Sequence, residues 1–280
     1  LLHKEEPFLD NTSKIKPVKM AAEERRKYIL SMLEQYGSVT VSELSEHFGI
    51  SEVSVRKLLI SLEQDSLLQR TWGGAVRTAR TTAELPYQVR ESKYLQEKMA
   101  IARAAYDMIN DGDSVYLDSG TTTFELAKLL CNGPKRGILV ATNALDHAGV
   151  LLGQQGISLI LIGGEIRHDV RACSGYLAKD MLSNMVFDKG FLGIEHISFS
   201  HGLTTPNMND AEMKRWILRT CKQSYVLADY SKFWNDSLIQ IAPADRVYRI
   251  ITDWHIAEDD ISRFQAKGVS LVSAPAVSNL

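Results

Sequence analysis

The sequence predicts an α/β protein in which a small helical domain precedes a largely parallel, doubly wound sheet. Between residues 20 and 77, three short amphipathic segments lead into a β-prone hairpin. From residue 98 onward, apolar runs of strand length alternate with helical segments, which is typical of a parallel sheet with helices on both faces. A chain of 280 residues is long enough to hold two domains with separate cores.

The overall composition is that of a soluble globular protein. Hydrophobic residues make up 45% of the chain and the formal net charge is −2, so any binding of nucleic acid must depend on a local basic surface. No apolar stretch approaches the ~20 residues that cross a bilayer, and the polar N-terminus does not resemble a signal peptide. Cys131, Cys173 and Cys221 include no C-x-x-C pair. We expect reduced thiols, a cytoplasmic location and no membrane partner.

Three short helices are expected after a disordered lead. Residues 1–19 are polar and lack periodicity, so we expect them to be disordered. The next segment keeps apolar residues on one helical face until Gly37. Thr40 is placed to cap a second helix that Gly49 ends, and Ser51 to cap a third. This order, with a tight turn before the third helix, predicts a helix-turn-helix unit.

The third helix offers a polar face that suits DNA. Ser54 lies near its start and the cations Arg56 and Lys57 follow, away from the apolar stripe, as in a recognition helix lying in the major groove. The alternative is a helical bundle that contacts only proteins, because eight acids between Glu23 and Asp65 cancel in number the cations of the domain, which are Arg25, Arg26, Lys27, Arg56, Lys57, Arg70, Arg77 and Arg80. Charge placement outweighs the total, since salt screens charges beyond ~10 Å.

A wing hairpin is expected directly after the third helix. Two β-prone runs within Leu67–Val76 flank a Gly-Gly turn. Between residues 66 and 83 the chain carries Arg70, Arg77 and Arg80 and no acid. This basic strip suits the phosphates of a nucleic acid backbone.

The stretch Val115–Thr123 joins a strand, a turn and the start of a helix. After the apolar run come Asp118, Ser119, Gly120 and three threonines. Gly120 lets the backbone approach a ligand, and the hydroxyls accompany N–H groups that lack intrahelical partners. With the helix dipole they form an anion cradle, most suited to phosphate. The alternative is a simple helix cap, with Asp118 bonded to the local backbone.

The second half of the chain predicts the strands of the sheet. Residues 78–97, with Pro86 and alternating charges, are expected to be a linker, and a helix from about Leu95 to Asn110 follows. The apolar runs that fit strands are Ser114–Leu117, Ile138–Ala141, Ile157–Ile162, Gly190–Ile194, Ser224–Ala228, Val247–Thr252 and Val269–Val272.

Polar and glycine-rich loops follow several of these runs. Ligands of parallel sheets bind at the carboxyl ends of strands, so these loops are candidates for a binding site. We expect a polar pocket formed by the Asp118 loop together with Thr142, Asn143, Gly163, Gly164, Asp229 and Lys232.

The two halves together resemble the DeoR family of bacterial transcriptional regulators of sugar metabolism. The resemblance covers about Ala21 to Val272, and it depends on the order and spacing of its segments. They are Ser51-Glu-Val-Ser-Val-Arg-Lys57, Leu62-Glu63, Arg70-Thr-Trp-Gly-Gly-Ala75, Asp118-Ser-Gly-Thr-Thr-Thr123, Thr142-Asn143, Gly163-Gly164, Asp188-Lys-Gly-Phe-Leu-Gly193, Gly202-Leu-Thr204 and Ala228-Asp-Tyr-Ser-Lys-Phe233.

The resemblance implies a winged helix-turn-helix domain over residues 20–77. It implies that residues 98–280 form a sensing and oligomerisation domain, Rossmann-like and related in fold to sugar-phosphate isomerases but without established catalysis. The DNA-binding residues expected from pattern and resemblance are Ser51, Ser54, Arg56, Lys57, Arg70, Trp72, Gly73 and Gly74. The expected effector-binding residues are Asp118, Ser119, Gly120, Thr121, Thr122, Thr123, Thr142, Asn143, Gly163, Gly164, Lys214, Asp229 and Lys232.

The expected function is that of a transcriptional regulator, and more specifically a repressor of a carbohydrate-utilisation operon. It would bind double-stranded operator DNA as a homo-oligomer, a dimer or a tetramer, and respond to a phosphorylated sugar. We expect no catalytic residue and no cofactor. We also expect no metal, because the 7 histidines show no H-x-x-x-H or H-E-x-x-H spacing.

The chain departs from the family pattern on and around the third helix. The family usually has Thr where this chain has Ser54, a second Arg at Lys57, Asp at Leu58, Gly at Ser66 and His at Trp72. Lysine at position 57 gives up bidentate geometry toward guanine or phosphate. Operator preference is therefore expected to differ from that of relatives.

Two other functions are compatible with the sequence. One is a sugar-phosphate isomerase-like enzyme with an appended helical domain, in which Glu165, Asp188, Glu212 and Lys214 would transfer protons. Such groups must lie within hydrogen-bond reach of the substrate, which one sequence does not show. The other is an architectural DNA-binding protein whose second domain only oligomerises.

Overall fold

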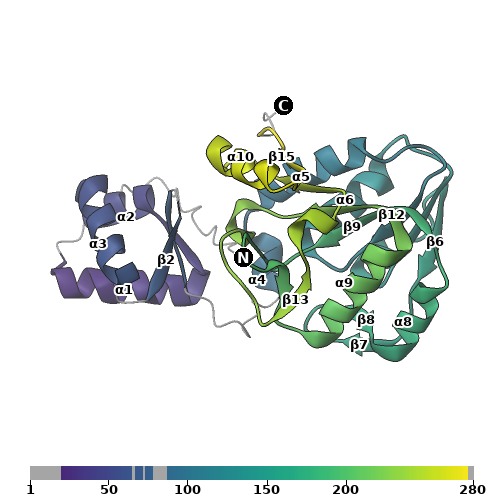
Figure 1. Ribbon diagram of the computed structural model, residues 1–280, viewed down its shortest axis with the longest axis horizontal. Helices are drawn as coiled ribbons and strands as arrows, with labels where there is room; N and C mark the ends of the chain where they lie inside the picture. Colours follow the sequence, from purple (N-terminus) through teal and green to yellow (C-terminus); the bar gives the residue numbers. More distant parts are fainter. Residues whose placement is uncertain (1–19, 65–66, 72, 78–86, 277–280) are drawn as a thin grey trace, which may run out of the picture. The chain divides into compact units, whose positions relative to one another are not determined.

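The computed structural model describes residues 20–64, 67–71, 73–77 and 87–276. The expected disordered lead, Trp72 and Arg80 lie outside the described residues, as does the side chain of Arg77. Two compact units, Leu1–Thr78 and Ala79–Leu280, make up the chain and are drawn in Figure 1.

The N-terminal unit combines three helices with a small antiparallel sheet. Its helices are α1 (Ala22–Tyr36), α2 (Val41–Phe48) and α3 (Glu52–Gln64), and its strands are β1 (Ser38–Thr40), β2 (Leu68–Thr71) and β3 (Gly74–Arg77), in the order β1-β3-β2. The three predicted helices and the wing hairpin are confirmed. The strand β1 was not predicted, because three residues between two helices carry no periodic pattern.

The predicted helix boundaries follow from local chemistry. Gly37 ends α1 with a left-handed φ of 79°, a conformation that costs glycine little. The Thr40 hydroxyl accepts from the Glu43 N–H at 3.2 Å, and the Glu43 carboxylate accepts from the Thr40 N–H at 3.1 Å. This reciprocal capping box begins α2. Ile29 and Leu59 lie with other apolar residues of all three helices in one fully enclosed core.

The C-terminal unit is built on a seven-stranded parallel sheet. Its strands in spatial order are β15 (Leu271–Ser273), β14 (Arg249–Thr252), β12 (Cys221–Leu227), β9 (Phe187–Gly193), β4 (Ser114–Leu117), β5 (Ile138–Thr142) and β6 (Ile157–Leu161). Every neighbouring pair is parallel. Each strand overlaps one of the predicted apolar runs, so the sheet prediction is confirmed. The chain winds away from β4 in both directions, which makes the gap between β4 and β9 the topological switch point.

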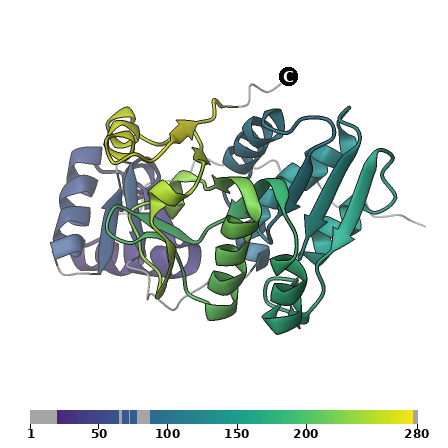
Figure 2. The ribbon, with the colours of Figure 1, turned by 45° about the vertical axis from the view of Figure 1, so that its right-hand side comes forward.

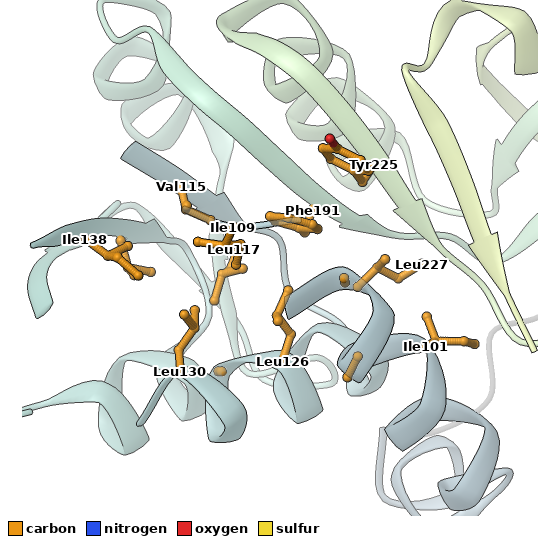
Figure 3. Packing of buried hydrophobic residues seen from close by; sticks show 14 of the residues in the cluster. Ile101, Ile109, Val115, Leu117, Leu126, Leu130, Ile138, Phe191, Tyr225 and Leu227 are labelled. Carbon is orange, nitrogen blue, oxygen red and sulfur yellow. The ribbon is translucent and has the colours of Figure 1, made fainter. Parts of the chain in front are cut away.

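Helices cover both faces of this sheet, as predicted. They are α5 (Leu95–Asp107), α6 (Thr121–Asn132), α7 (Leu145–Leu151), α8 (Gly175–Ser183), α9 (Met208–Thr220) and α10 (Glu258–Ala266). Along β4, Val115 and Leu117 face a core with α5, α6 and α7, while Tyr116 faces α8 and α9. Figure 2 shows α8 and α9 beside the sheet, and Figure 3 shows Leu126 and Leu130 of α6 pointing toward the opposite core.

Two small antiparallel sheets were not predicted. The strands β7 (Glu165–Arg167) and β8 (Ala172–Ser174) form a hairpin. The strands β10 (His196–Ser198), β11 (Gly202–Thr205) and β13 (Ile239–Ala242) form a second sheet. The segment Gly202–Thr204, one of the segments that carry the family resemblance, therefore lies in a strand. Strands of three and four residues are too short to show a clear alternating pattern in the sequence.

The linker prediction is wrong for its second half. Tyr87–Ser92 forms a helix, α4, and α5 begins at Leu95. Tyr87 is buried and α4 packs against α6, so this part of the predicted linker belongs to the C-terminal unit. In the described ranges, no helix combines the length and the apolar character required to cross a membrane.

Candidate functional site

The exposed face of α3 gathers the residues predicted to contact DNA. Ser54, Arg56 and Lys57 are exposed, while Val55 between them is fully buried. The Ser51 hydroxyl accepts from the Ser54 N–H at 3.3 Å, which caps the helix. Arg56 Nη2 lies 2.7 Å from Glu52 Oε2, one turn earlier on the same exposed face. The helix therefore presents hydroxyls and cations together to solvent.

Arg70 on β2 is tied to the end of α3. Its Nε lies 2.7 Å from Glu63 Oε2, and its backbone N–H donates to Glu63 Oε1 at 2.8 Å. These two hydrogen bonds from Arg70 lower the pKa of Glu63. Because one carboxylate holds both the backbone and the side chain, the wing is fixed relative to α3. The guanidinium stays partly exposed.

Gly74, expected at the DNA surface, is instead buried beneath β1. A Cβ there would lie 1.9 Å from the carbonyl oxygen of Val39. Gly74 pairs with Thr40 in the β1–β3 ladder, and the Gly73 carbonyl accepts from the Val41 N–H at 2.8 Å. Glycine at position 74 is thus required by strand pairing. Gly73 has open space where its Cβ would be.

A pocket lies at the carboxyl ends of β4, β9 and β12. Its empty volume of about 530 Å³ includes space open to solvent. It sits at the switch point of the sheet, where ligands of such folds bind. Its lining residues are Arg90, Ser119, Gly120, Thr121, Thr122, Val170, Gly193, Ile194, Glu195, Thr205, Asp210, Lys214, Leu227 and Lys232.

The start of α6 forms one wall of this pocket. Gly120 occupies the cap position and no side chain caps the helix, so the first N–H groups lack intrahelical partners. A Cβ on Gly193, at the end of β9, would lie 3.6 Å from the Gly120 Cα. This close approach of two glycines leaves the backbone reachable. Free N–H groups, the hydroxyls of Thr121 and Thr122 and the helix dipole suit a phosphate.

Two cations and one carboxylate stand at a second wall. Lys232 Nζ lies 3.4 Å from Glu195 Oε1, and Arg90 Nη1 lies 3.6 Å from Glu195 Oε2. Burial of Glu195 favours its neutral form, but the charges of Lys232 and Arg90 prevail and lower its pKa. The wall therefore carries one net positive charge, which favours an anionic guest.

Beneath the pocket Lys214 is held between two carboxylates. It pairs with Asp118, and its Nζ lies 3.2 Å from Asp210 Oδ1. The Thr205 hydroxyl donates to Asp210 Oδ2 at 2.6 Å. Burial opposes the charge on Lys214, but Asp118 and Asp210 raise its pKa, so it stays protonated. Burial raises the pKa of Asp118 to about 6 despite Lys214.

The polar groups of three predicted effector residues form hydrogen bonds inside the protein. The Thr123 hydroxyl donates to the Asp118 carbonyl at 2.6 Å, and the Thr142 hydroxyl accepts from the Ala144 N–H at 3.1 Å. Asn143 accepts from the Tyr116 hydroxyl at 3.1 Å and donates to the Cys173 carbonyl at 2.9 Å. None of the three lines the pocket. Asn143 instead fastens the β7–β8 hairpin to the sheet.

Gly163, Gly164 and Asp229 also lie off the pocket lining. A Cβ on Gly164 would lie 2.5 Å from the Ser174 carbonyl oxygen, so this glycine admits the hairpin. Asp229 caps a short 3-10 helix, η1 (Tyr230–Lys232), by accepting from the Ser231 N–H at 3.1 Å. Its role is therefore to place Lys232.

The pocket adds residues that the sequence analysis missed. Glu195 directly follows the predicted run Gly190–Ile194, and Thr205 ends the segment that became β11. The rule that ligands bind at strand ends would have found Glu195. Nothing local marks Arg90, because it lies in the predicted linker.

A helix-turn-helix unit with exposed cations and a separate α/β unit with a phosphate-suited pocket define a class of protein. This class is the DNA-binding regulator that carries a small-molecule sensing domain.

Residues 25–81 match the model of the DeoR-like helix-turn-helix domain, and residues 93–254 match that of the DeoR C terminal sensor domain. The chain belongs to the DeoR family of transcriptional regulators.

Curated relatives extend the match over most of the chain. A protein of Escherichia coli O157:H7, named provisionally as an aga operon transcriptional repressor, is 34% identical over 89% of this chain and 93% of its own length. The transcriptional repressor GlcR of Bacillus subtilis is 33% identical over 84% of this chain and 89% of its own. A solved structure of D-ribose-5-phosphate isomerase overlaps 49% of this chain and 52% of its own, at 17% identity and a TM-score of 0.36.

Proposed function

We propose that this regulator represses a carbohydrate-utilisation operon and that a phosphorylated sugar modulates its binding to operator DNA. The observation that carries the effector proposal is the pocket where the uncapped start of α6 faces Lys232 and Arg90. Two relatives are named as repressors, which supports the direction of regulation.

The proposed pose places the phosphate against Ser119, Gly120, Thr121 and Thr122. This part of the cradle lines the pocket, whereas Thr123 is turned inward. Lys232 and Arg90 would complete the anion site from the opposite wall. The sugar hydroxyls would face Glu195 and Thr205, in place of the Asn143 and Asp229 expected from the sequence.

On the DNA side we propose that α3 enters the major groove. Ser54, Arg56 and Lys57 would contact base edges or phosphates, and Arg70 would contact the backbone. A homo-oligomer with two-fold symmetry would match two operator half-sites. Sedimentation velocity of the full chain would show a dimer or tetramer on this proposal, and a monomer at micromolar concentration would contradict it.

We propose that the chain is not an enzyme and needs no cofactor. Asp188 Oδ1 lies 2.8 Å from Lys222 Nζ, and Glu212 Oε1 lies 2.8 Å from Lys179 Nζ. Neither carboxylate lines the pocket, nor does Glu165. Of the four groups considered for proton transfer, Lys214 alone reaches the pocket, and its bonds to two carboxylates keep it protonated.

The first test is thermal unfolding with sugar phosphates beside their parent sugars. A ligand present at 100 times its dissociation constant stabilises the folded state by ~2.7 kcal/mol. We expect a shift with one phosphate, none with its free sugar, and loss of the shift in Lys232→Gln. Lys222→Gln, an exposed lysine paired with Asp188, is the matched control and should keep the shift.

The second test measures DNA binding by fluorescence anisotropy, on a duplex selected from a random library. The stabilising phosphate should change the dissociation constant by ~5- to 150-fold, the range of a 1 to 3 kcal/mol coupling. A thermal shift without any change in DNA affinity would contradict the proposal that the pocket senses an effector. No shift with any phosphate would favour the architectural alternative.

A further inference from the structure

Lys98 on α5 is a lysine enclosed in the protein interior. It is 3% exposed, and burial lowers its pKa to about 8. In residues 87–276 no carboxylate forms an ion pair with it. Its Nζ instead donates to the carbonyl oxygen of Lys93 at 2.6 Å and to that of Arg90. An ammonium group without a counter-ion is costly to bury, so its position calls for a specific reason.

The carbonyls that Lys98 binds belong to the end of α4 and the turn after it. The last carbonyls of a helix lack intrahelical partners, and a cation there is favourable. The helix α4 has 6 residues, too few to be stable alone. A second residue that holds α4 in place is Tyr87. It is buried, and its ring centroid lies 5.6 Å from Arg171 Cζ. Lys98 therefore fixes the end of α4 that carries Arg90 to the pocket.

The 3-10 helix η1, which carries Lys232, contacts the turn between α4 and α5. Tyr94, between α4 and α5, packs edge-on against Tyr230 of η1 with ring centroids 5.3 Å apart. Asp229, which caps η1, attracts the charge of Lys98. The supports of Arg90 and Lys232 thus converge on one buried lysine.

We propose that Lys98 is the positioning residue of the effector pocket, which holds Arg90 beside Lys232 at the second wall by fastening the carbonyl end of α4. The ligand class is a dianion of the phosphate or sulfate type, and the inference rests on the proposed function of the pocket. An anion bound at the start of α6 then pulls on Arg90, and through it on α4.

The charge of Lys98 gives this role a pH signature. The charged groups around it are Arg90 on α4, Asp229 and Lys232 at η1, and Glu125 on α6. At pH 7 most Lys98 side chains carry the charge that holds the carbonyls, and at pH 9 most have lost the proton and the hold weakens. Sulfate keeps its charge between pH 7 and pH 9. Sulfate affinity should therefore fall across this range.

The experiment is calorimetric titration of the full chain with sulfate at pH 7 and pH 9. At pH 7, Lys98→Met and Arg90→Gln should each weaken sulfate binding by about tenfold, the value of one charged hydrogen bond. The double variant should be no weaker than either single variant, because Lys98 acts through Arg90. The pH dependence should vanish in both single variants. Lys135→Met removes a lysine that donates to the Ile109 carbonyl at the far end of α5, and it should bind sulfate like the parent.

Two results would overturn the proposal while leaving the pocket intact. One is additive losses in the double variant, and the other is a pH dependence that persists in Arg90→Gln. The second result decides the matter even if Lys98→Met fails to fold. Absence of sulfate binding by the parent chain would overturn this inference together with the proposed effector site.

Discussion

The two units of this regulator place the charged groups of their proposed binding sites in opposite environments. In the N-terminal unit, Arg56 and Arg70 each pair with one glutamate, and these side chains remain 36 to 54% exposed. In the C-terminal unit, Lys214 is 4% exposed and pairs with two carboxylates, of which Asp118 is fully enclosed. Both units bind anions on our proposal, but only the N-terminal unit presents the cations of its proposed binding surface directly to solvent.

This difference indicates which charged side chains can exchange one ion-pair partner for another. An exposed ion pair contributes ~0.2 to 1 kcal/mol, so Arg56 and Arg70 can leave their glutamates for DNA phosphates at little cost. A buried pair that loses one member costs ~3 to 5 kcal/mol. Lys214 therefore stays with its carboxylates and shapes the pocket, while Lys232 and Arg90 share Glu195 at its second wall.

The largest effect is expected for Lys214→Met. It leaves the buried Asp118 and the partly exposed Asp210 without their cation, and the free energy of unfolding should fall by ~3 to 5 kcal/mol. Urea denaturation followed by circular dichroism measures it. The control is Lys179→Met, whose pair with Glu212 is exposed, and it should change stability by less than ~0.5 kcal/mol. Equal losses in the two variants would erase the distinction between buried and exposed ion pairs.

Gly74→Ala tests whether Gly74 serves the pairing of β3 with β1 and not contact with DNA. The added methyl group would press on the Val39 carbonyl and should cost ~2 to 3 kcal/mol of unfolding free energy. Gly73→Ala, next to it, meets open space and should be close to neutral. If both alanines were tolerated while DNA affinity fell, Gly74 would be a contact residue after all.

Arg56→Gln should separate binding from stability. DNA affinity should fall by ~1 to 3 kcal/mol if Arg56 contacts a base, while unfolding changes by less than ~0.5 kcal/mol. Anisotropy titrations and urea curves on the same samples provide both quantities. Arg103→Gln, an exposed arginine on α5, supplies the control for net charge. A stability loss as large as the binding loss would count against an exposed, exchangeable pair.

The smallest effect is expected for Glu63→Gln. Neutralising Glu63 releases the charge of Arg70, so DNA affinity should rise by up to about fivefold, the value of one exposed pair. Glu46→Gln makes the same charge change at an exposed position on α2. An equal gain in both variants, read from anisotropy at fixed salt, would attribute the effect to net charge alone.

Local signals in the sequence were enough for most of the fold. Apolar runs and their flanking turns gave all seven strands of the parallel sheet, and Gly37, Thr40 and Gly49 marked the helix ends. These features depend on neighbours within a few residues. The hairpin β7–β8 depends instead on Asn143 reaching Cys173, 30 positions away, and no local pattern announces such a contact.

The binding site was predictable only in part, for a related reason. Thr121 and Thr123 look alike in sequence, and both begin the same helix. One lines the pocket, while the other donates to the Asp118 carbonyl beneath it. Which way each hydroxyl points depends on how α6 packs against the sheet. Arg90 reaches the pocket from a helix that the sequence suggested was a linker, so tertiary packing alone identifies it.

The uncapped start of α6 offers a way to measure effector binding in the absence of DNA. Because no side chain closes its first turn, a bound phosphate would itself act as the missing cap. Filling the pocket and ordering the backbone amides of residues 121–123 would then be one event. Deuterium uptake at these amides would slow in proportion to occupancy, so mass spectrometry of one short peptide could screen metabolites against the native chain.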